Sequence, residues 1–146
     1  MYWAQDRLGR IRIKYAYAYN DLLQNSEGVI ALGTDFPVEG IEPLHTFYAA
    51  IQRRDLDGYP DEGFQAENEL SKKDALRGMT IWAAYANFED EIKGSLEEGK
   101  FADFVVLDKD ILEISEKKIP RVDVLSTFIN GEQLFVSEKF QKSTPK

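Results

Sequence analysis

The chain has 146 residues, 43% of them hydrophobic and 12% aromatic, which is typical of one globular domain with a core and not of a disordered segment. Its formal net charge of −8 argues against binding to nucleic acid or to an anionic membrane surface, because both need a basic patch. No cysteine is present, so disulfides and thiolate metal sites are excluded. The start of the chain resembles no signal peptide, and no apolar run is long enough to span a membrane, which predicts a soluble, cytoplasmic protein.

The first part of the chain is predicted to be mainly helical around a single strand. A short helix reaches about Leu8 and breaks at Gly9, and a second helix covers residues 11–24. The apolar run VIALGT, from Val29 to Thr34, follows a turn and predicts a buried strand. Residues 43–54 then form a predicted helix with proline in its first turn.

The middle of the chain combines a long loop with a second helical region. Residues 55–69 have no periodicity, and loops of this length are often binding or lid segments. Ser71 and Asp74 have the spacing of a capping box, and apolar residues at helical spacing predict a helix over residues 71–86. Gly78 lies inside this helix, where glycine costs about 1 kcal/mol relative to alanine, so we expect close approach of another element there.

The last third of the chain is predicted to be a small antiparallel sheet. Residues 104–107 and 122–129 have the composition of strands. Asn130-Gly131 is a strong two-residue hairpin signal and leads into a third strand over residues 132–136. The fold class predicted for the whole chain is therefore α+β.

Asp35 is the strongest candidate for a functional residue. In an extended strand it shares one face with Ala31 and Gly33, while the opposite face carries the bulkier Ile30, Leu32 and Thr34. Small residues facing a crowded barrel interior, with a carboxylate at the C-terminal end of the strand, are typical of (β/α) barrel enzymes. The same pattern also fits an aspartate that closes the following turn through an Asx hydrogen bond, and the residues alone leave both interpretations open.

Other candidate sites are weaker. His45 is the only histidine and is expected to be a packed or surface residue, since one histidine without cysteine makes no typical catalytic zinc site. Residues 55–66 fail as a calcium loop, because Gly58 falls at the fourth position and Ala66 at the twelfth, where glutamate belongs. No phosphate-binding glycine motif and no G-x-S-x-G motif is present, so nucleotide binding and serine hydrolysis are not supported.

Several motifs in colinear order resemble the metal-dependent amidohydrolase superfamily, in particular its amidohydrolase 3 or YtcJ-like branch. Residues 32–39, LGTDFPVE, resemble the motif of the last barrel strand in that branch. Residues 93–108, KGSLEEGKFADFVVLD, resemble the C-terminal signature that begins its β-sandwich. Weaker matches cover WAQDRLGR at residues 3–10, Ala75-Leu76 and residues 80–85.

This resemblance implies a C-terminal fragment of a (β/α)8 metal-dependent hydrolase, with residues 1–92 as a partial barrel segment that holds the last strand, Val29 to Thr34, and its flanking helices. Residues 93–146 are then a small β-sandwich portion of the composite domain. The resemblance also implies that Asp35 is both a catalytic residue and a metal ligand, accepting a proton from a metal-bound water. The implied cofactor is a divalent metal, zinc by family, and the implied reaction is hydrolysis of a carbon–nitrogen bond in a small amide-type substrate.

The resemblance is incomplete at the metal site. The family uses a His-x-His pair, a mid-barrel lysine or carboxylate and two further histidines, and none of these is in this sequence. We therefore expect the isolated chain to bind no metal and to be inactive, and to associate with itself or with a complementing chain. It would be a truncated gene product, a split-gene subunit or a fragment. The alternative is a non-enzymatic α+β interaction module or remnant.

Overall fold

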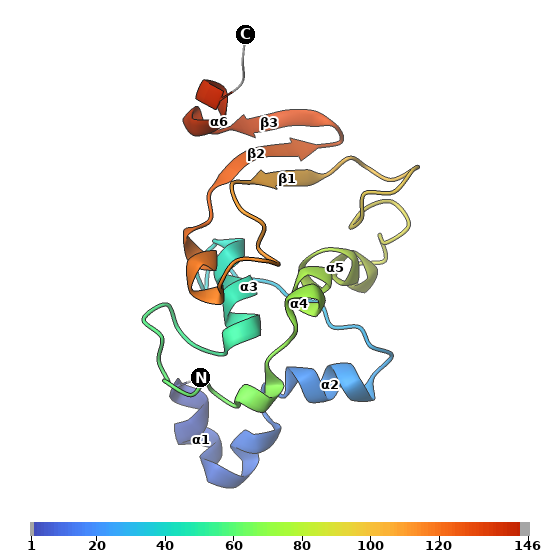
Figure 1. The fold of residues 1–146 in the computed structure, drawn as a ribbon. Helices are drawn as coiled ribbons and strands as arrows, with labels where there is room; N and C mark the ends of the chain where they lie inside the picture. The colour runs from blue at the N-terminus through green and yellow to red at the C-terminus, as the bar shows by residue number, and fades with distance from the viewer. Residues whose placement is uncertain (1, 144–146) are drawn as a thin grey trace.

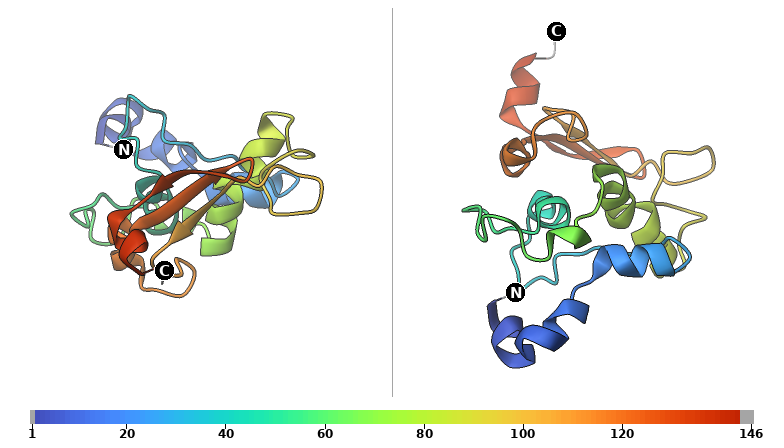
Figure 2. Two further views of the ribbon diagram at one scale, coloured as in Figure 1. Left: turned by 90° about the horizontal axis from the view of Figure 1, so that it is seen from above. Right: turned by 60° about the horizontal axis from the view of Figure 1, so that its bottom comes forward.

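The structure is a computed structural model that describes residues 2–143. It has an α+β architecture, as predicted, with the sheet at one end, α1 at the other end and the remaining large helices between them (Figures 1 and 2). None of its helices is long and apolar enough to cross a membrane within the described residues. The elements in chain order are α1 (Tyr2–Arg12), a 3-10 helix (Ile13–Tyr15), α2 (Tyr19–Asn25), α3 (Pro43–Gln52), a 3-10 helix (Ala66–Asn68), α4 (Lys72–Met79), α5 (Ile81–Ala86), β1 (Phe104–Leu107), a 3-10 helix (Glu116–Arg121), β2 (Val124–Ile129), β3 (Glu132–Val136) and α6 (Glu138–Ser143).

The hydrophobic core is built around α3. Phe47 is 1% exposed and packs in one cluster with residues from α2, from α4 and from the connection between β1 and β2. Ile119, in the last 3-10 helix, is fully buried in the same cluster. The helical part and the C-terminal part therefore share one core. Its buried members are Leu23, Phe47, Tyr48, Ala50, Ile51, Leu70, Ala75, Ile111, Ile119 and Val122.

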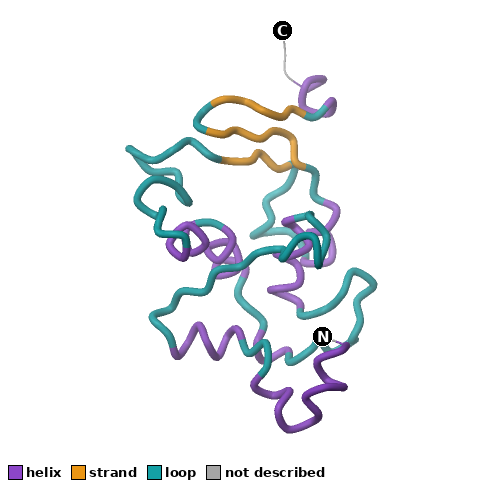
Figure 3. The backbone as a smooth tube through the Cα atoms, turned by 180° about the vertical axis from the view of Figure 1, so that it is seen from behind, coloured by secondary structure: helices purple, strands orange, loops and turns teal. Residues whose placement is uncertain are grey.

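The sheet is antiparallel with strand order β1-β2-β3, and Figure 3 shows it as a separate layer. The predicted hairpin is confirmed: Asn130 and Gly131 both have positive φ (50° and 78°), as a type I′ turn requires. Phe104 pairs directly with Phe128, and their rings stack with centroids 4.4 Å apart. β2 begins two residues later than predicted, because Val122 packs into the core at 7% exposure and not in the ladder.

The predicted helix over residues 11–24 is wrong. α1 instead continues past a kink at Gly9 (φ 69°) to Arg12, and a new helix, α2, begins at Tyr19. The restart has a tertiary cause: the side-chain oxygen of Asn68 accepts hydrogen bonds from the N–H groups of Asn20 and Asp21, at 3.1 and 3.2 Å. An acceptor 47 or 48 residues away in sequence thus caps the first turn of α2, which a local pattern does not reveal.

The predicted helix over residues 71–86 is divided at Thr80 into α4 and α5. Its start is as expected, because the N–H of Asp74 donates to the hydroxyl of Ser71 (3.1 Å). At the break, the Thr80 hydroxyl donates to the carbonyl oxygen of Leu76 (2.7 Å), while the backbone N–H of Thr80 donates to the carbonyl oxygen of Arg77 (3.1 Å). A threonine side chain that occupies the carbonyl four residues back competes with the helical ladder, which accounts for the interruption.

The predicted strand from Val29 to Thr34 does not form. The segment lies between α2 and α3 without a neighbouring strand in the described part of the chain, so it has no ladder. Instead, the N–H of Leu32 donates to the carbonyl oxygen of Gly78 in α4 (2.9 Å). The expected close approach at Gly78 is confirmed, because a Cβ there would lie 2.8 Å from Cγ of Leu32 and 3.0 Å from the oxygen of Ile30.

Candidate functional site

The two faces predicted for residues 29–35 exist although the strand does not. Ile30 and Leu32 are partly buried and pack against the core cluster. Ala31, Gly33 and Asp35 are exposed. The contact with Gly78 holds the bulky face on α4, and this contact leaves the small face and its carboxylate open to solvent.

Asp35 begins a tight turn. Its φ is +54°, a left-handed conformation that aspartate tolerates better than most residues, and the N–H of Val38 donates to its carbonyl oxygen (2.8 Å). The hydroxyl of Thr34 accepts from the N–H of Phe36 (3.3 Å). Within residues 2–143 the Asp35 carboxylate makes no hydrogen bond or ion pair, so the alternative in which it closes the turn through an Asx bond does not form.

The described residues do not fit a metal site on their own. Among them there is no group of three or more histidine, cysteine, aspartate or glutamate side chains that could hold a metal ion. His45 lies in the first turn of α3, where it is partly buried and its N–H donates to the carbonyl oxygen of Glu42 (3.0 Å). Asp35 is therefore presented by the fold without a set of partner ligands from residues 2–143.

The 55–69 loop lies at the opposite end of α3 from Asp35. The chain enters α3 after the Asp35 turn and leaves it at Arg53, and a ten-residue helix is about 15 Å long. Inside the loop, the Asp55 carboxylate accepts from the N–H groups of Asp57 (3.0 Å) and Tyr59 (2.8 Å). The loop is thus closed on itself, away from the candidate carboxylate.

Arg53 anchors this loop, and sequence reasoning missed it. The residue is 8% exposed, and its Nε donates to the carbonyl oxygen of Phe64 (2.9 Å). Its guanidinium lies 5.5 Å from the ring centroids of both Tyr19 and Phe64. Burial lowers the pKa of Arg53 from its ordinary value. No local signal predicts this role, because the partners come from two distant segments.

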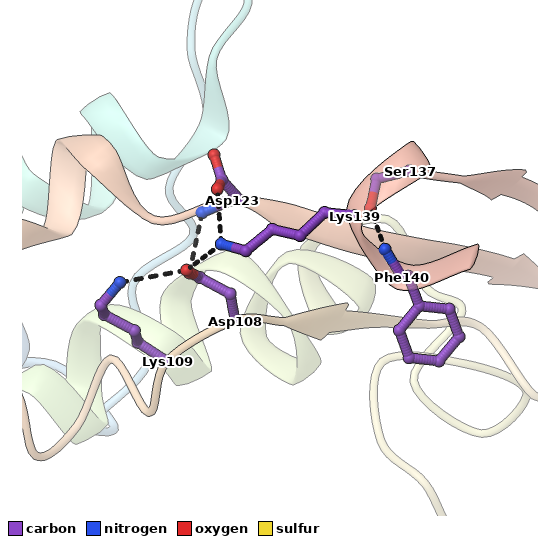
Figure 4. Close-up of polar contacts among 6 residues, drawn as sticks. All are labelled: Asp108, Lys109, Asp123, Ser137, Lys139 and Phe140. Carbon is purple, nitrogen blue, oxygen red and sulfur yellow. Dashed lines mark hydrogen bonds and ion pairs between the residues drawn. The ribbon is translucent and has the colours of Figure 1, made fainter. Parts of the chain in front are cut away.

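A second group of charges that the sequence did not reveal attaches α6 to the sheet (Figure 4). Asp108, just after β1, accepts from Lys139 (2.9 Å), Lys109 (3.0 Å) and the N–H of Asp123 (3.0 Å). Lys139 also pairs with the carboxylate of Asp123 (3.0 Å). Chiefly through Lys139, this environment holds the pKa of Asp108 well below its usual range, and the same contacts raise the pKa of Lys139. All the partners named here are residues of the same chain, so we assign this group of charges a structural role.

Comparison with known proteins shows which sequences this chain is similar to. The chain is 38% identical over 130 residues to the protein LONG AFTER FAR-RED 3 of Arabidopsis thaliana, covering 88% of this chain and 22% of that protein. It is 29% identical over 134 residues to the candidate amidohydrolase YtcJ of Bacillus subtilis (strain 168), covering 91% and 25%. It is 30% identical over 102 residues to an N-substituted formamide deformylase of Arthrobacter pascens, covering 70% and 18%. The chain thus spans between about a fifth and a quarter of the length of these relatives.

The fold agrees with the sequence comparison. The structure matches the crystal structure of a metal-dependent hydrolase from Pyrococcus horikoshii OT3 with a TM-score of 0.67 and 30% identity, covering 78% of this chain and 23% of the other. The family profile described as "Amidohydrolase family" matches residues 1–135, almost the entire chain. The expected membership of the amidohydrolase superfamily, with a YtcJ-like relative, is confirmed, and the chain belongs to the amidohydrolase family.

Proposed function

We propose that the chain is the C-terminal part of a metal-dependent hydrolase that acts on carbon–nitrogen bonds other than peptide bonds. The observation that carries this proposal is the exposed carboxylate of Asp35, which the packing of residues 30 and 32 on α4 presents to solvent. The family match supports a hydrolase, and the name of the formamide deformylase supports a small amide-type substrate.

In this proposal Asp35 is a catalytic residue and one ligand of a divalent metal, with zinc as the first candidate. The described residues hold no other ligand set, so the remaining ligands belong to segments that the longer relatives have and that residues 2–143 do not supply. The isolated chain is therefore expected to bind no metal tightly and to hydrolyse nothing. Metal content and turnover of N-substituted formamides by the purified chain test this; stoichiometric zinc together with turnover would contradict it.

The positive test is complementation. The chain is mixed with a truncated family member that lacks the region matched here, and turnover is measured in the complex. Asp35→Asn keeps the size of the side chain and should abolish turnover while leaving complex formation intact. Glu132→Gln removes another exposed carboxylate, from the distant hairpin, and should leave turnover unchanged. Equal activity of the Asp35→Asn complex and the unsubstituted complex would refute a catalytic role for Asp35.

We also propose that residues 1–92 are a partial barrel segment and residues 93–146 a small β-sandwich portion. In a complemented complex, residues 29–34 would then pair with strands of the other polypeptide, because within residues 2–143 their backbone makes only the one bond to Gly78 described above. Slowed amide hydrogen exchange across residues 29–34 on complementation supports this, and unchanged exchange opposes it. A cytoplasmic location stays a prediction.

A second candidate function is a non-enzymatic α+β interaction module that associates with itself or with a partner. The exposed apolar residues around Asp35 favour it: Phe36, Val38 and Ile41 are 60%, 77% and 62% exposed. The two candidate functions can be distinguished by the reading frame that lies next to the gene for this chain. An adjacent frame that encodes His-x-His and the other barrel strands supports the hydrolase, and a frame without them supports the interaction module.

A further inference from the structure

The N-terminal helical segment has a surface that the rest of the chain leaves uncovered. We define residues 2–15, which are α1 and the following 3-10 helix, as the basic arm. In it Trp3, Ile11 and Tyr15 are 79%, 79% and 84% exposed. Its helices pack mainly on each other, and Figure 1 shows α1 projecting from the end of the molecule opposite the sheet. These three apolar side chains on a projecting element are therefore accessible to a partner.

The basic arm has a charge opposite to that of the whole chain. It holds four basic residues (Arg7, Arg10, Arg12 and Lys14) against one acidic residue, Asp6, for a net charge of +3. The complete chain has a net charge of −8, so the remaining residues carry −11. None of the four basic side chains forms an ion pair within residues 2–143. The arm is therefore a cationic, partly apolar surface on an acidic protein.

The complementary surface is the 55–69 loop, which we call the acidic loop. It contains six acidic residues and no basic one. Leu56 and Tyr59 are 57% and 56% exposed on it. The carboxylates of Asp57, Asp61 and Glu62 form no ion pair within the described chain. Charge and apolar character both match the basic arm.

The two surfaces lie side by side in one molecule. The side-chain amide of Gln65, in the acidic loop, donates to the carbonyl oxygen of Ile13 in the arm. Tyr17, just beyond the arm, packs edge-to-face on Phe64, with ring centroids 6.2 Å apart. In a two-fold symmetric pair, adjacent complementary patches are both satisfied at once: each arm meets the loop of the other copy.

We infer that this face binds a second copy of the chain, through two equivalent contacts of the basic arm with the acidic loop. The inference deepens the self-association within the proposed function and does not depend on hydrolase activity. The occupant follows from charge: the loop of a second copy offers the carboxylates of Asp57, Asp61 and Glu62, which form no ion pair within the described chain, to an arm of +3. Each copy has a net charge of −8, so the two copies repel each other overall. At physiological ionic strength the Debye length is about 8 Å, so this long-range repulsion is screened more strongly than the attraction between opposite charges in direct contact.

The test is the oligomeric state of the full chain by sedimentation equilibrium at physiological salt, with charge-swap variants. Arg7→Glu with Arg10→Glu should weaken the dimer about tenfold or more, and Asp57→Lys with Asp61→Lys should do the same, since tenfold corresponds to ~1.4 kcal/mol. A mixture of the two double variants should form a heterodimer, because both of its contacts pair opposite charges at the substituted positions: one contact keeps the original residues, and the other has the charges of both sides reversed. All four side chains are exposed, so the fold should be retained, which circular dichroism verifies.

The matched control is Lys117→Glu with Lys118→Glu, which makes the same change of net charge on an exposed part of the last 3-10 helix. It should leave the dimer unchanged. A monomer at ~100 μM would overturn the inference, and so would arm variants that behave like the control, or a mixture that does not associate. Because turnover is not measured, failure here is distinct from failure of the proposed hydrolase, which the Asp35→Asn complementation experiment decides.

Discussion

Gly78→Ala is the sharpest test of how the candidate site is held. The added Cβ would lie 2.8 Å from Cγ and 2.9 Å from Cδ1 of Leu32, and 3.0 Å from the carbonyl oxygen of Ile30. Overpacking of this kind costs about 1–3 kcal/mol, while replacing glycine by alanine inside a helix recovers about 1 kcal/mol. The net expectation is a loss of up to about 2 kcal/mol in the free energy of unfolding.

The measurement is urea unfolding followed by tryptophan fluorescence, with Trp82 packed against the core as the internal reporter. Gly40→Ala is the matched control, because nothing lies within 4 Å of its added Cβ, and it should be neutral or slightly stabilising. In a Leu32→Ala background the main clash is gone, so Gly78→Ala should there become neutral or stabilising. The close approach would be refuted if the Gly78→Ala protein were at least as stable as the unsubstituted chain and if its change in the free energy of unfolding simply added to that of Leu32→Ala.

Two further predictions concern contacts that only the tertiary structure shows. Asn68→Ala removes the acceptor shared by the N–H groups of Asn20 and Asp21 and should cost about 1–3 kcal/mol in urea unfolding, whereas Asn68→Asp, which keeps an acceptor oxygen, should lose less. The lowered pKa of Asp108 means that its stabilising contribution is present above its unfolded pKa of about 4 and lost as pH falls through the folded value. The raised pKa of Lys139 gives a contribution that is present below about pH 10 and lost as pH rises further. Lys139→Met should therefore lower the unfolding midpoint at pH 7 but much less at pH 2, and an equal difference at both pH values would count against the charge contacts.

Local signals predicted the element boundaries that depend on neighbouring residues. Ser71 caps α4 through an N–H only three residues away, and Asn130-Gly131 forms the hairpin turn because both residues tolerate positive φ. Gly78 is a special case. Its cost in a helix predicted a close neighbour, and the structure identifies that neighbour as Leu32.

Three predicted elements failed, two of them because of distant or missing partners and one because of a side-chain contact only four residues back. The helix over residues 11–24 is interrupted because Asn68 caps a new start at Tyr19. The helix over residues 71–86 is divided where the Thr80 hydroxyl takes the carbonyl oxygen of Leu76. Residues 29–34 have the composition of a strand, but a strand requires a neighbour for its hydrogen bonds, and the described chain offers only the carbonyl of Gly78.

The sequence by itself determined the fold class, the hairpin, the alternation of bulky and small residues before Asp35, and the family to which these motifs belong. The first three follow from residue types a few positions apart, and the family follows from several motifs in colinear order along the chain. Tertiary structure alone decided that the bulky face lies on α4 and leaves the carboxylate exposed, that Arg53 and Asp108 are structural, and that a basic arm lies beside an acidic loop. These features join residues tens of positions apart, so they arise only when the chain closes on its core.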